Sequence, residues 1–429
     1  ISYTAVKFDK AAADCRITSC MFNEIGANAV FIHGDFVVPA TTKNINITDC
    51  HINKYGRIFN NAIGILLTHA IDCELSNNEI HDGWYTGVSV GWSWGYADHP
   101  TNKIKICNNL IYNIGNGWLS DMGGIYTLGV QPDTVISGNV IYNVGCDEGR
   151  YGYGGWGIYL DEGSSGILVE KNLVYDCSSN SLHQHYGKDN LIKNNIFAFS
   201  DDGQVLITRK EDHNSLYLYN NILVSEDEAM YKTAVKKDWF TDNNNIYWDY
   251  VNEEKIFSDN NISVKKMQNR GYYNNAVISD PCFRDAENRD FRLAVNSPVY
   301  GTDFGKAYIN KALIGKNAAG ETVGYVISAT SGDGFDGNIV MSIGLDVNGV
   351  VTGIEFTTIS ETAGMGMKVT EAEFKDQFLG DDVDSFVVNK AGGSTEPNQI
   401  DSVAGATISS RAVTNAVNAA RDFYAANMK

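Results

Sequence analysis

The sequence predicts a mainly β chain in which a parallel β-helix of stacked rungs is followed by a small α+β domain. The first part is predicted by a repeat: an apolar strand ends in Asn or another small polar residue, and a hydrophobic pair follows. These anchor residues are 23 to 33 residues apart, at positions 20, 50, 78, 109, 139, 172, 195, 221 and 245. A strand-bearing repeat of this length is typical of a solenoid.

The second part is predicted by a change of pattern near residue 300. We expect the β-helix over residues 1–305, a linker over 306–320 and the α+β domain over 321–429. Within that domain, strands are expected at 322–329, 337–347 and 350–358, and helices near 370–378 and 410–426. The last helix has one apolar stripe, typical of packing against a core, formed by Val413, Ala416, Val417, Ala420 and Tyr424.

The recurring asparagines are explained better by structure than by function. A side-chain amide at the same turn of every rung predicts a ladder of stacked amides. We therefore treat these residues as scaffold and look for the functional site elsewhere.

Composition narrows the classes of partner. The chain has 33 Lys and Arg residues against 52 Asp and Glu residues, a formal net charge of −19. A surface this acidic repels nucleic acid and anionic membranes, so neither is an expected partner. No run of 18 apolar residues exists, so no membrane span is expected. The eight cysteines lack CxxC spacing, and several lie in apolar strand-like runs. Buried free thiols are therefore expected rather than a disulfide framework or a zinc site.

Each rung has a second strand, and aligning these strands predicts one polar outer face. The aligned segments are 88–91, 125–128, 158–161, 182–185 and 205–208. Because side chains alternate along a strand, Tyr126, Tyr159 and His183 share an outward column, with Asp161 and His185 beside it. We expect this face to hold the functional site.

Long loops next to that face are rich in aromatic residues. The excursions 84–100 and 146–156 carry, among others, Trp92, Trp94, Tyr151, Tyr153 and Trp156. Aromatic rings above a sheet are suited to stack on sugar rings and form the walls of a groove. The alternative is that these rings cap hydrophobic gaps between loops.

Paired carboxylates on this face predict sugar-cleaving chemistry. Glycosidases place two carboxyl groups on either side of the scissile bond, and Asp121, Asp161 and Glu162 are the candidates. Strand alternation turns Asp161 outward, whereas Glu162 shares the parity of the inward residues unless the strand ends first. The alternative for Asp121 is a turn residue that accepts backbone amides before Gly123.

The two histidines of the outer face have a supporting role in this interpretation. We expect His183 and His185 to bind substrate hydroxyls or to orient Asp161. No metal is expected there, because no carboxylate stands at a fixed ligand spacing from them.

The final helix of the α+β domain is preceded by the segment Asp401-Ser-Val-Ala-Gly-Ala-Thr407-Ile-Ser409. Small residues and hydroxyls before a helix N-terminus favour a phosphate, although an ordinary capping turn is the alternative. This segment resembles the flavinylation motif of the FMN-binding domain found in subunits of membrane redox pumps. Residues 361–366, Glu-Thr-Ala-Gly-Met-Gly, resemble a second segment of that domain. The resemblance implies FMN bonded through its phosphate to Ser409, contacts from Thr407, and recognition of Asp401 by a flavin transferase.

The first 305 residues resemble secreted bacterial right-handed parallel β-helix proteins of the pectate-lyase-like superfamily. The segments 121–126, 156–163 and 183–188 are most similar to glycoside hydrolase family 141, with family 136 as the rival. The resemblance implies hydrolysis of a fucoside, a xylan or a mucin- or milk-type glycan. It also implies an extracellular or cell-surface location. Because the chain begins at Ile1 without a methionine and enters the repeat almost at once, we expect a signal peptide and some N-terminal sequence to be missing from it.

Two other functions stay open. A polysaccharide lyase on the same fold would need a basic residue to abstract a proton, and Arg209 and Lys210 are the only basic pair placed for it. A glycan-binding solenoid without catalytic activity, tethered to a flavin domain, is the second alternative.

Overall fold

The computed structural model divides the chain into two compact units, residues 1–304 and 305–429. It describes all residues except 1–2, 148, 150–153, 210, 233–238, 253–256, 260–261, 295–296, 303, 306–307, 333, 336–337, 384 and 429. The expected aromatic residues Tyr151 and Tyr153, and Lys210, lie outside the described residues. No helix in the described ranges is long and apolar enough to cross a membrane.

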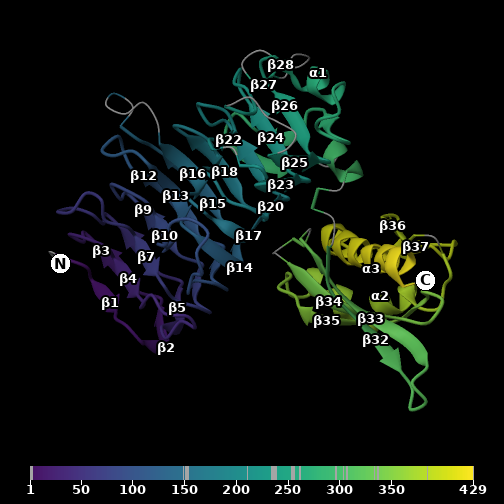
Figure 1. Cartoon of the computed structure of the whole chain (residues 1–429). Coiled ribbons are helices and arrows are strands. Elements are labelled where there is room, and N and C mark those ends of the chain that lie inside the picture. The colour runs from purple at the N-terminus through teal and green to yellow at the C-terminus, as the bar shows by residue number, and fades with distance from the viewer. Residues whose placement is uncertain are drawn as a thin grey trace. The chain divides into compact units, whose positions relative to one another are not determined.

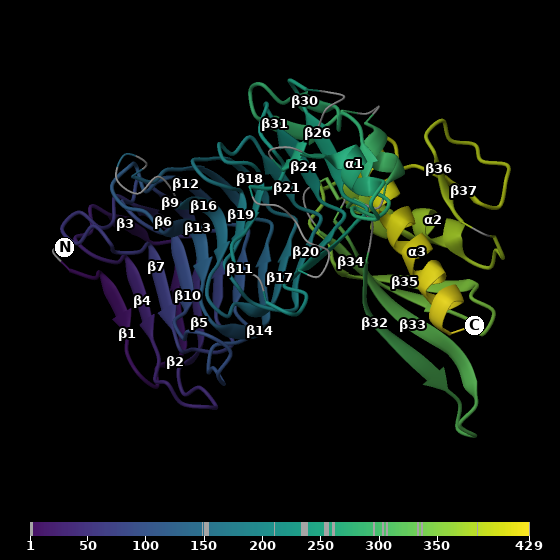
Figure 2. The ribbon, with the colours of Figure 1, turned by 45° about the horizontal axis from the view of Figure 1, so that its top comes forward.

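The first unit is a β-helix built from three long parallel sheets (Figures 1 and 2). Sheet A carries the outer face predicted above. Its strands lie side by side in the order β1 (Val6–Phe8), β4 (Val30–His33), β7 (Ile65–Thr68), β10 (Val88–Gly91), β13 (Met122–Thr127), β16 (Gly155–Leu160), β19 (Leu182–Gln184) and β22 (Val205–Ile207).

The other two sheets complete each rung. Sheet B contains β2 (Ala13–Thr18), β5 (Lys43–Thr48), β8 (Glu74–Ser76), β11 (Lys105–Cys107), β14 (Val130–Ser137), β17 (Ser165–Glu170), β20 (Asn190–Lys193), β23 (Leu216–Tyr219) and β25 (Phe240–Asn243). Sheet C contains β3 (Met21–Asn23), β6 (His51–Asn53), β9 (Glu79–His81), β12 (Leu110–Ile114), β15 (Val140–Val144), β18 (Leu173–Cys177), β21 (Ile196–Ala198), β24 (Ile222–Ser225), β26 (Ile246–Asp249) and β29 (Val277–Ile278).

The anchor residues form the turn from sheet B to sheet C. Two residues separate the two strands in each rung, as Asn108 and Asn109 separate β11 from β12. The first of the two has a left-handed backbone, with φ of 55° at Asn108, a conformation that Asn tolerates better than most residues. The second is the anchor, and its side chain points along the stack of rungs.

The predicted amide ladder is confirmed. The Nδ2 atom of Asn109 donates to the Oδ1 atom of Asn139 at 2.9 Å and to the carbonyl oxygen of Leu75 at 2.9 Å. The same pattern joins the anchors 78, 109, 139, 172, 195, 221 and 245. Every one of these amides is buried. Since a buried amide without partners is costly, the ladder fixes the register of the rungs.

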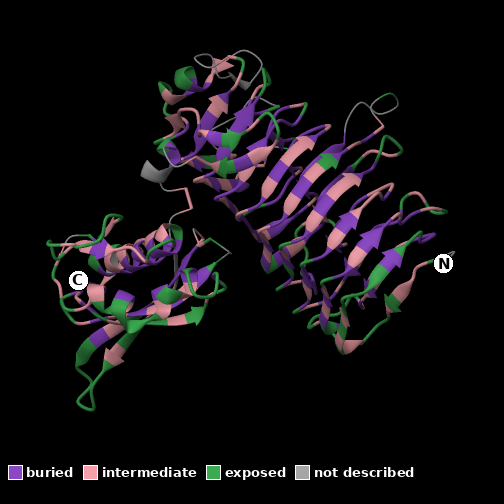
Figure 3. Cartoon of the chain, turned by 180° about the vertical axis from the view of Figure 1, so that it is seen from behind, coloured by how far each residue is buried: buried purple, intermediate pink, exposed green. Residues whose placement is uncertain are grey.

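The core of the β-helix is a column of aliphatic side chains inside the three sheets. Buried and partly exposed residues alternate along many strands, as in β4 and β20 (Figure 3). The core includes stacked isoleucines and valines such as Ile47, Ile106, Ile136 and Val169. The eight cysteines are free, and four of them are buried. This agrees with the expectation of unpaired thiols.

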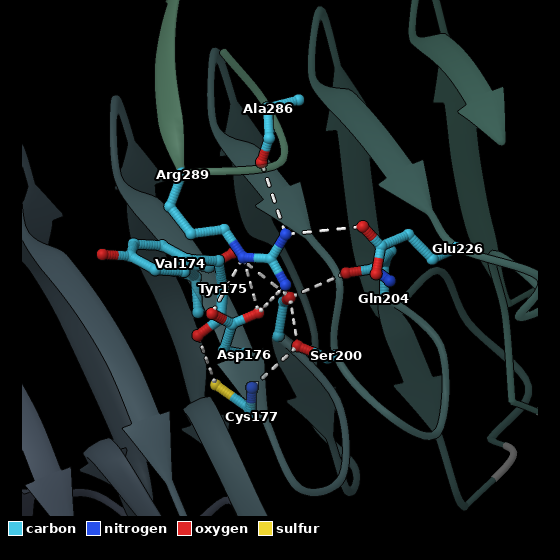
Figure 4. Close-up of polar contacts among 10 residues, drawn as sticks. Val174, Tyr175, Asp176, Cys177, Ser200, Gln204, Glu226, Ala286 and Arg289 are labelled. Carbon is cyan, nitrogen blue, oxygen red and sulfur yellow. Dashed lines mark hydrogen bonds and ion pairs between the residues drawn. The ribbon is translucent and has the colours of Figure 1, made fainter. Parts of the chain in front are cut away.

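A hairpin covers the outer face of sheet C near the end of the solenoid. Its strands β30 (Phe283–Asp285) and β31 (Asp290–Leu293) are antiparallel, and Phe283 and Phe291 pack with Phe199 and Val224. Between the strands, the guanidinium of Arg289 binds Asp176 and Glu226 (Figure 4). It also lies 4.3 Å from the ring centre of Phe199. Short elements precede it: β27 (Phe257–Asp259), β28 (Ile262–Ser263) and α1 (Val264–Gln268).

The second unit is a four-stranded antiparallel sheet packed against a long helix. The strands are β32 (Tyr308–Lys316), β33 (Thr322–Ser331), β34 (Ile339–Leu345) and β35 (Val351–Thr358). The helix α3 (Thr407–Asn427) buries the predicted apolar stripe against them. Shorter elements are α2 (Ala372–Lys375), β36 (Val387–Asn389) and β37 (Gln399–Asp401), with 3₁₀ turns at Gly366–Thr370 and Asp376–Phe378. Another 3₁₀ turn, Pro298–Gly301, belongs to the first unit.

The linker expected over residues 306–320 is wrong for most of its length. Residues 308–316 form β32, which pairs with β33 from Tyr308–Thr330 to Lys316–Thr322. The segment Tyr308–Lys316 has several small and polar residues, which is why its pattern did not predict a strand. Its position at the edge of the sheet explains the pattern, because an edge strand pairs on one side only.

Candidate active site

The register of sheet A brings the predicted outer column together. Backbone pairing places Tyr126 beside Tyr159, and Tyr159 beside His183. Ser89 precedes this column and Leu206 follows it. The alignment made from the repeat therefore agrees with the structure at each of these rungs.

Asp121 and Asp161 approach this column from two different turns. Asp121 lies immediately before β13 with φ of 59°, and Asp161 immediately after β16. Gly123 follows in strand β13, where an added Cβ would lie 2.9 Å from the carbonyl oxygen of Ile125 and 3.1 Å from Cβ of Tyr159. A larger residue at 123 would push Tyr159 away, so the glycine permits the close approach.

One tyrosine hydroxyl connects the two carboxylates. The Tyr159 hydroxyl lies 2.9 Å from Oδ1 of Asp161 and 3.1 Å from Oδ1 of Asp121. The two carboxylate oxygens are therefore at most about 6 Å apart, the sum of those two lengths. The other oxygen of Asp161 accepts the hydroxyl of Tyr126 at 2.5 Å. Asp121 thus binds Tyr159 rather than acting only as a turn residue.

The surroundings of Asp121 and Asp161 differ in burial and in hydrogen-bond donors. Burial raises the pKa of Asp121, and the nearby charge of Asp161 raises it further, although the residue reaches the surface. A single Tyr159 hydroxyl has one hydrogen, so it donates to one carboxylate and accepts from the other. Asp161, which is 8% exposed, receives two hydroxyl donors. The raised pKa makes Asp121 the candidate to carry a proton, and its contact with Tyr159 is satisfied when Asp121 donates.

Three residues expected to touch substrate are buried: Tyr159, which is 4% exposed, and two residues that pack against it. His183 is 2% exposed, stacks on Tyr159 with ring centres 4.5 Å apart, and bonds Thr208 through Nε2. Burial lowers its pKa well below the usual value, so the ring is neutral. Trp156 is 3% exposed and packs against Tyr159 and His183. The expectation of substrate contact is wrong for His183 and Trp156, because both are buried against the ring of Tyr159.

Glu162 belongs to a neighbouring cluster. The strand β16 ends at Leu160, so Glu162 escapes the inward burial that parity predicted. Its Oε2 accepts the Tyr186 hydroxyl at 3.0 Å, and its Oε1 lies 3.9 Å from Nε2 of His185. The exposed Arg209 stacks over the ring of Tyr186 at 4.3 Å. This cluster, made of Glu162, His185, Tyr186 and Arg209, lies beside the Asp121 and Asp161 pair.

The loop after β10 supplies exposed aromatic rings. The Trp92 ring centre lies 6.4 Å from that of Tyr126, and its Nε1 donates to Ser89 Oγ at 2.9 Å. Trp94 is 61% exposed and packs edge-on against Trp92. Further along, Tyr96 donates to Glu211, so this loop reaches residues several rungs away.

Sequence reasoning missed Tyr85, whereas Tyr96 was among the aromatic residues expected on the 84–100 loop. Tyr85 donates to the carbonyl oxygen of Asp121 at 2.8 Å, and Tyr96 contacts Tyr186. Tyr85 stands three residues before β10, at the turn that enters sheet A. Asp121 lies at the equivalent turn of the next rung, so an alignment of turns as well as strands would have paired them.

The second unit has a cleft of about 480 Å³ at the start of α3. The exposed apolar residues Phe335, Met365 and Ile408 line it, together with Thr407 and Ser409. No side chain caps the helix at Ala406, so its first amides are available to a phosphate. The predicted residues Thr407 and Ser409 therefore share one cleft with apolar walls, which fits a flavin ring and its phosphate.

Ser409 is held in place from the other side of this cleft. Its hydroxyl donates to Oε2 of Glu361 at 2.8 Å, and Oε1 of Glu361 accepts the amide of Phe335 at 2.8 Å. Gly366 allows this contact, because an added Cβ there would lie 2.6 Å from Oε2 of Glu361. The segment around Glu361 and the helix start therefore form one site.

Asp401 has a different surrounding. Its carboxylate accepts the amides of Gly393 at 2.8 Å and of Ser394 at 3.1 Å, and hydrogen bonding by Ser394 lowers its pKa. It lines a separate cleft with Gln377, whose Oε1 accepts the amide of Asp401 at 2.6 Å. The structure thus places Asp401 outside the cleft of Ser409.

Comparison with known families agrees with this division. Residues 64–245 match the family described as a right-handed β-helix region, and residues 334–422 match the FMN-binding domain. The chain joins a right-handed β-helix to an FMN-binding domain. The expected architecture is therefore confirmed, whereas the particular glycoside hydrolase family stays a prediction.

The FMN-binding domain has relatives in membrane redox complexes. A component of the Na⁺-translocating ferredoxin:NAD⁺ oxidoreductase complex of Acetobacterium woodii is 36% identical over 112 residues, which cover 26% of this chain and 53% of that protein. The chain thus spans about half the length of this relative.

The β-helix resembles solved structures at low identity. A glycoside hydrolase is 20% identical with a TM-score of 0.38, covering 51% of this chain and 34% of that one. A mannuronan C-5 epimerase module of Azotobacter vinelandii is 13% identical with a TM-score of 0.43, covering 58% of this chain and 66% of that one.

Proposed function

We propose that the β-helix domain is a glycoside hydrolase whose catalytic carboxyl groups are Asp121 and Asp161. The observation that carries this proposal is the Tyr159 hydroxyl, which lies within hydrogen-bonding distance of both. Two carboxyl groups with one proton between them are the arrangement that glycosidic cleavage requires.

The two acids have different roles in this proposal. Asp121, whose pKa is raised, is the general acid that protonates the leaving oxygen. Asp161, which accepts hydrogen bonds from Tyr126 and Tyr159, acts as the second carboxyl group on the opposite side of the bond. The Tyr159 hydroxyl donates a hydrogen bond to Asp161 and accepts one from the protonated carboxyl of Asp121. When substrate binds, the leaving oxygen replaces Tyr159 as the acceptor of the Asp121 proton.

The short separation favours a retaining reaction. Carboxyl groups of retaining enzymes are about 5–5.5 Å apart, and those of inverting enzymes about 6.5–9.5 Å. The facing oxygens of Asp121 and Asp161 are no more than about 6 Å apart. In a retaining reaction Asp161 forms the glycosyl intermediate, and Asp121 then deprotonates the water that releases it.

The charges near the pair favour a neutral sugar. The groups that act on the pKa of Asp121 include the carboxylates of Asp161 and Glu162, which would repel a uronate. Arg209, the basic residue considered for a lyase, stacks on Tyr186 in the neighbouring cluster. We therefore propose a neutral glycan, such as a fucoside, a xylan or a mucin- or milk-type oligosaccharide, met outside the cell or at its surface.

A substrate panel and two variants test this function. Wild-type protein is assayed on such glycans for released sugar and at 235 nm for unsaturated product. Asp161→Asn is expected to lose activity on all substrates. Asp121→Asn is expected to keep far more activity on aryl glycosides, whose leaving groups need no acid, than on natural glycans.

The control is Asp133→Asn, which changes an exposed aspartate on sheet B and should leave the activity unchanged. An unsaturated product would replace the hydrolase with a lyase. Binding to a glycan without any product would replace it with a glycan-binding solenoid. Proton NMR of the first product tests the anomeric outcome separately, since inversion would contradict the retaining reaction alone.

We also propose that the second unit holds FMN through its phosphate on Ser409. The cleft that contains Ser409 and Thr407 has apolar walls and an uncapped helix start. Phe335, Met365 and Ile408 would contact the flavin ring, and a flavin transferase would be the partner that recognises the segment from Asp401. When bound, FMN supplies electron transfer.

A further inference from the structure

Three side chains with metal-binding groups converge on the outer face of sheet C. His51 begins β6, whereas Glu79 begins β9 and His81 ends it. The register pairs His51 with Glu79, and Asn53 with His81. Residues two apart on a strand share a face, so all three side chains lie on the same side. One ligand atom from each lies within 4.8 Å of the other two.

The two imidazoles face each other closely. Their Nε2 atoms are 2.7 Å apart, and the rings are stacked with centres 5.0 Å apart. Two nitrogen lone pairs cannot approach to this distance unless a proton or a cation lies between them. Without an ion, one imidazole therefore donates a hydrogen bond to the other. A cation bound between the two Nε2 atoms would replace that hydrogen.

The ligands also have outer partners. The Nδ1 atom of His81 lies 3.0 Å from Oδ2 of Asp82, and the Tyr112 hydroxyl donates to Oε1 of Glu79 at 2.8 Å. Metal-binding histidines usually bond a carboxylate through their second nitrogen, and ligating carboxylates are themselves hydrogen-bonded. These contacts fix the orientation of His81 and Glu79 independently of their mutual proximity. All three ligands are half-buried, so an ion from solvent can reach them.

We propose that His51, Glu79 and His81 bind a divalent transition-metal ion, for which zinc is the best-suited. Two imidazoles and one carboxylate are a recognised zinc set that leaves a fourth position for water. Nitrogen ligands of tetrahedral zinc are about 3.3 Å apart, given Zn–N bonds of about 2.0–2.1 Å. The rings must therefore separate by roughly 0.6 Å on binding, a small rotation for two side chains on a solvent-facing sheet.

The site is separate from the carboxylate pair, which lies on sheet A. An ion here would join β6 to β9 and so tie two rungs together. Because the unfolded chain does not hold these residues close, zinc is expected to stabilise the folded state.

Zinc titration of the full chain tests the site. Protein freed of metal with EDTA is titrated with ZnCl₂ by calorimetry and melted with and without zinc. We expect one ion per chain at this site and a higher melting temperature in zinc. Glu79→Gln and His81→Gln should each weaken binding at least tenfold and abolish the shift in melting temperature. Asp82→Asn should weaken binding about 10–100-fold, as expected for an outer partner.

The matched control is His33→Gln, because His33 is also a partly exposed strand histidine bonded to a carboxylate, that of Asp9. Its zinc affinity should equal that of the wild type. Two results would overturn the proposal: no zinc bound by wild type at about 0.1 mM, on the order of weak surface binding, or equal affinity in wild type, Glu79→Gln and His81→Gln. The second result would place the ion elsewhere, for example on free cysteines. Glu79→Gln retains an acceptor for Tyr112, so folding is preserved in this test.

Discussion

The hydroxyl of Tyr159 lies 2.9 Å from Oδ1 of Asp161, and on its other side the same oxygen faces Asp121. Removing it leaves Asp121 without this partner and Asp161 with the Tyr126 hydroxyl as its remaining tyrosine donor. We expect Tyr159→Phe to lower kcat by about 10–100-fold, the cost of roughly 1–3 kcal/mol for a lost hydrogen bond to a charge. Kinetics on the released sugar measure this. Tyr142→Phe, in a stack of rings on sheet C, should be silent; equal losses in both variants would contradict the role of Tyr159.

The burial of Asp242 predicts that the free energy of unfolding depends on pH. It is buried, the hydroxyls of Tyr231 and Tyr247 donate to it, and burial raises its pKa to about 6. The folded state thus binds a proton between about pH 4 and 6 that the unfolded state does not. The resulting stabilisation is complete below the unfolded pKa near 4 and is lost as the pH rises through 6.

Asp242→Asn is expected to remove this dependence. Relative to the variant, the wild type should lose on the order of 2–3 kcal/mol of unfolding free energy between pH 4 and 7. Urea unfolding at several pH values measures the difference. Asp133→Asn is the control and should show a flat difference; a flat difference for Asp242→Asn would mean that the carboxyl has an ordinary pKa.

We predict that Arg289 stabilises the hairpin of β30 and β31, in addition to the packing of Phe283 and Phe291. Arg289→Ala removes the contacts to Asp176 and Glu226 (Figure 4) and the contact to the Phe199 ring. Because the group is partly exposed, we expect a loss of only about 1–2 kcal/mol. Thermal unfolding and the rate of proteolysis in the hairpin measure it. Arg292→Ala, whose side chain is 71% exposed, should change neither; similar effects of both variants would exclude a special role for Arg289.

We predict that FMN is attached at Ser409. When a flavin transferase is co-expressed, wild-type protein should show yellow fluorescence that survives denaturing electrophoresis. Ser409→Ala should lose it completely, because the hydroxyl that bonds the phosphate is gone. Thr407→Ala changes a second hydroxyl of the same cleft and should retain the fluorescence. Fluorescence that persists in Ser409→Ala would assign another acceptor.

The repeat predicted most of the β-helix because its anchors are buried amides. An amide such as Asn139 must bond the rungs before and after it, so its position in the sequence reports the position of a rung. The register of Tyr126, Tyr159 and His183 followed from that spacing. The burial of His183 and Trp156 did not, since the alternation of a strand says which face a side chain is on but not what covers it.

The three possible metal ligands were missed for another reason. Glu79 and His81 lie 28 and 30 residues after His51 in the sequence, on the rung that follows it. Only the anchors at 50 and 78 bring them together, because His51 and Glu79 each follow an anchor directly. The signal was present in the repeat, and a search of equivalent positions across rungs would have found it.

The turn between sheets B and C limits where residues can be inserted into the chain during evolution. An inserted residue at Asn108 or Asn109 would break amide bonds to two neighbouring rungs. The corners that carry Asp121 and Asp161 have no such ladder among the described residues, and the loop from Gly91 to Lys105 is already long. Doubling a flexible loop costs only about 0.6 kcal/mol. Evolution can therefore lengthen or shorten the loops at these corners while one fixed corner preserves the scaffold. Under the proposed function, such changes would alter which glycan is accepted.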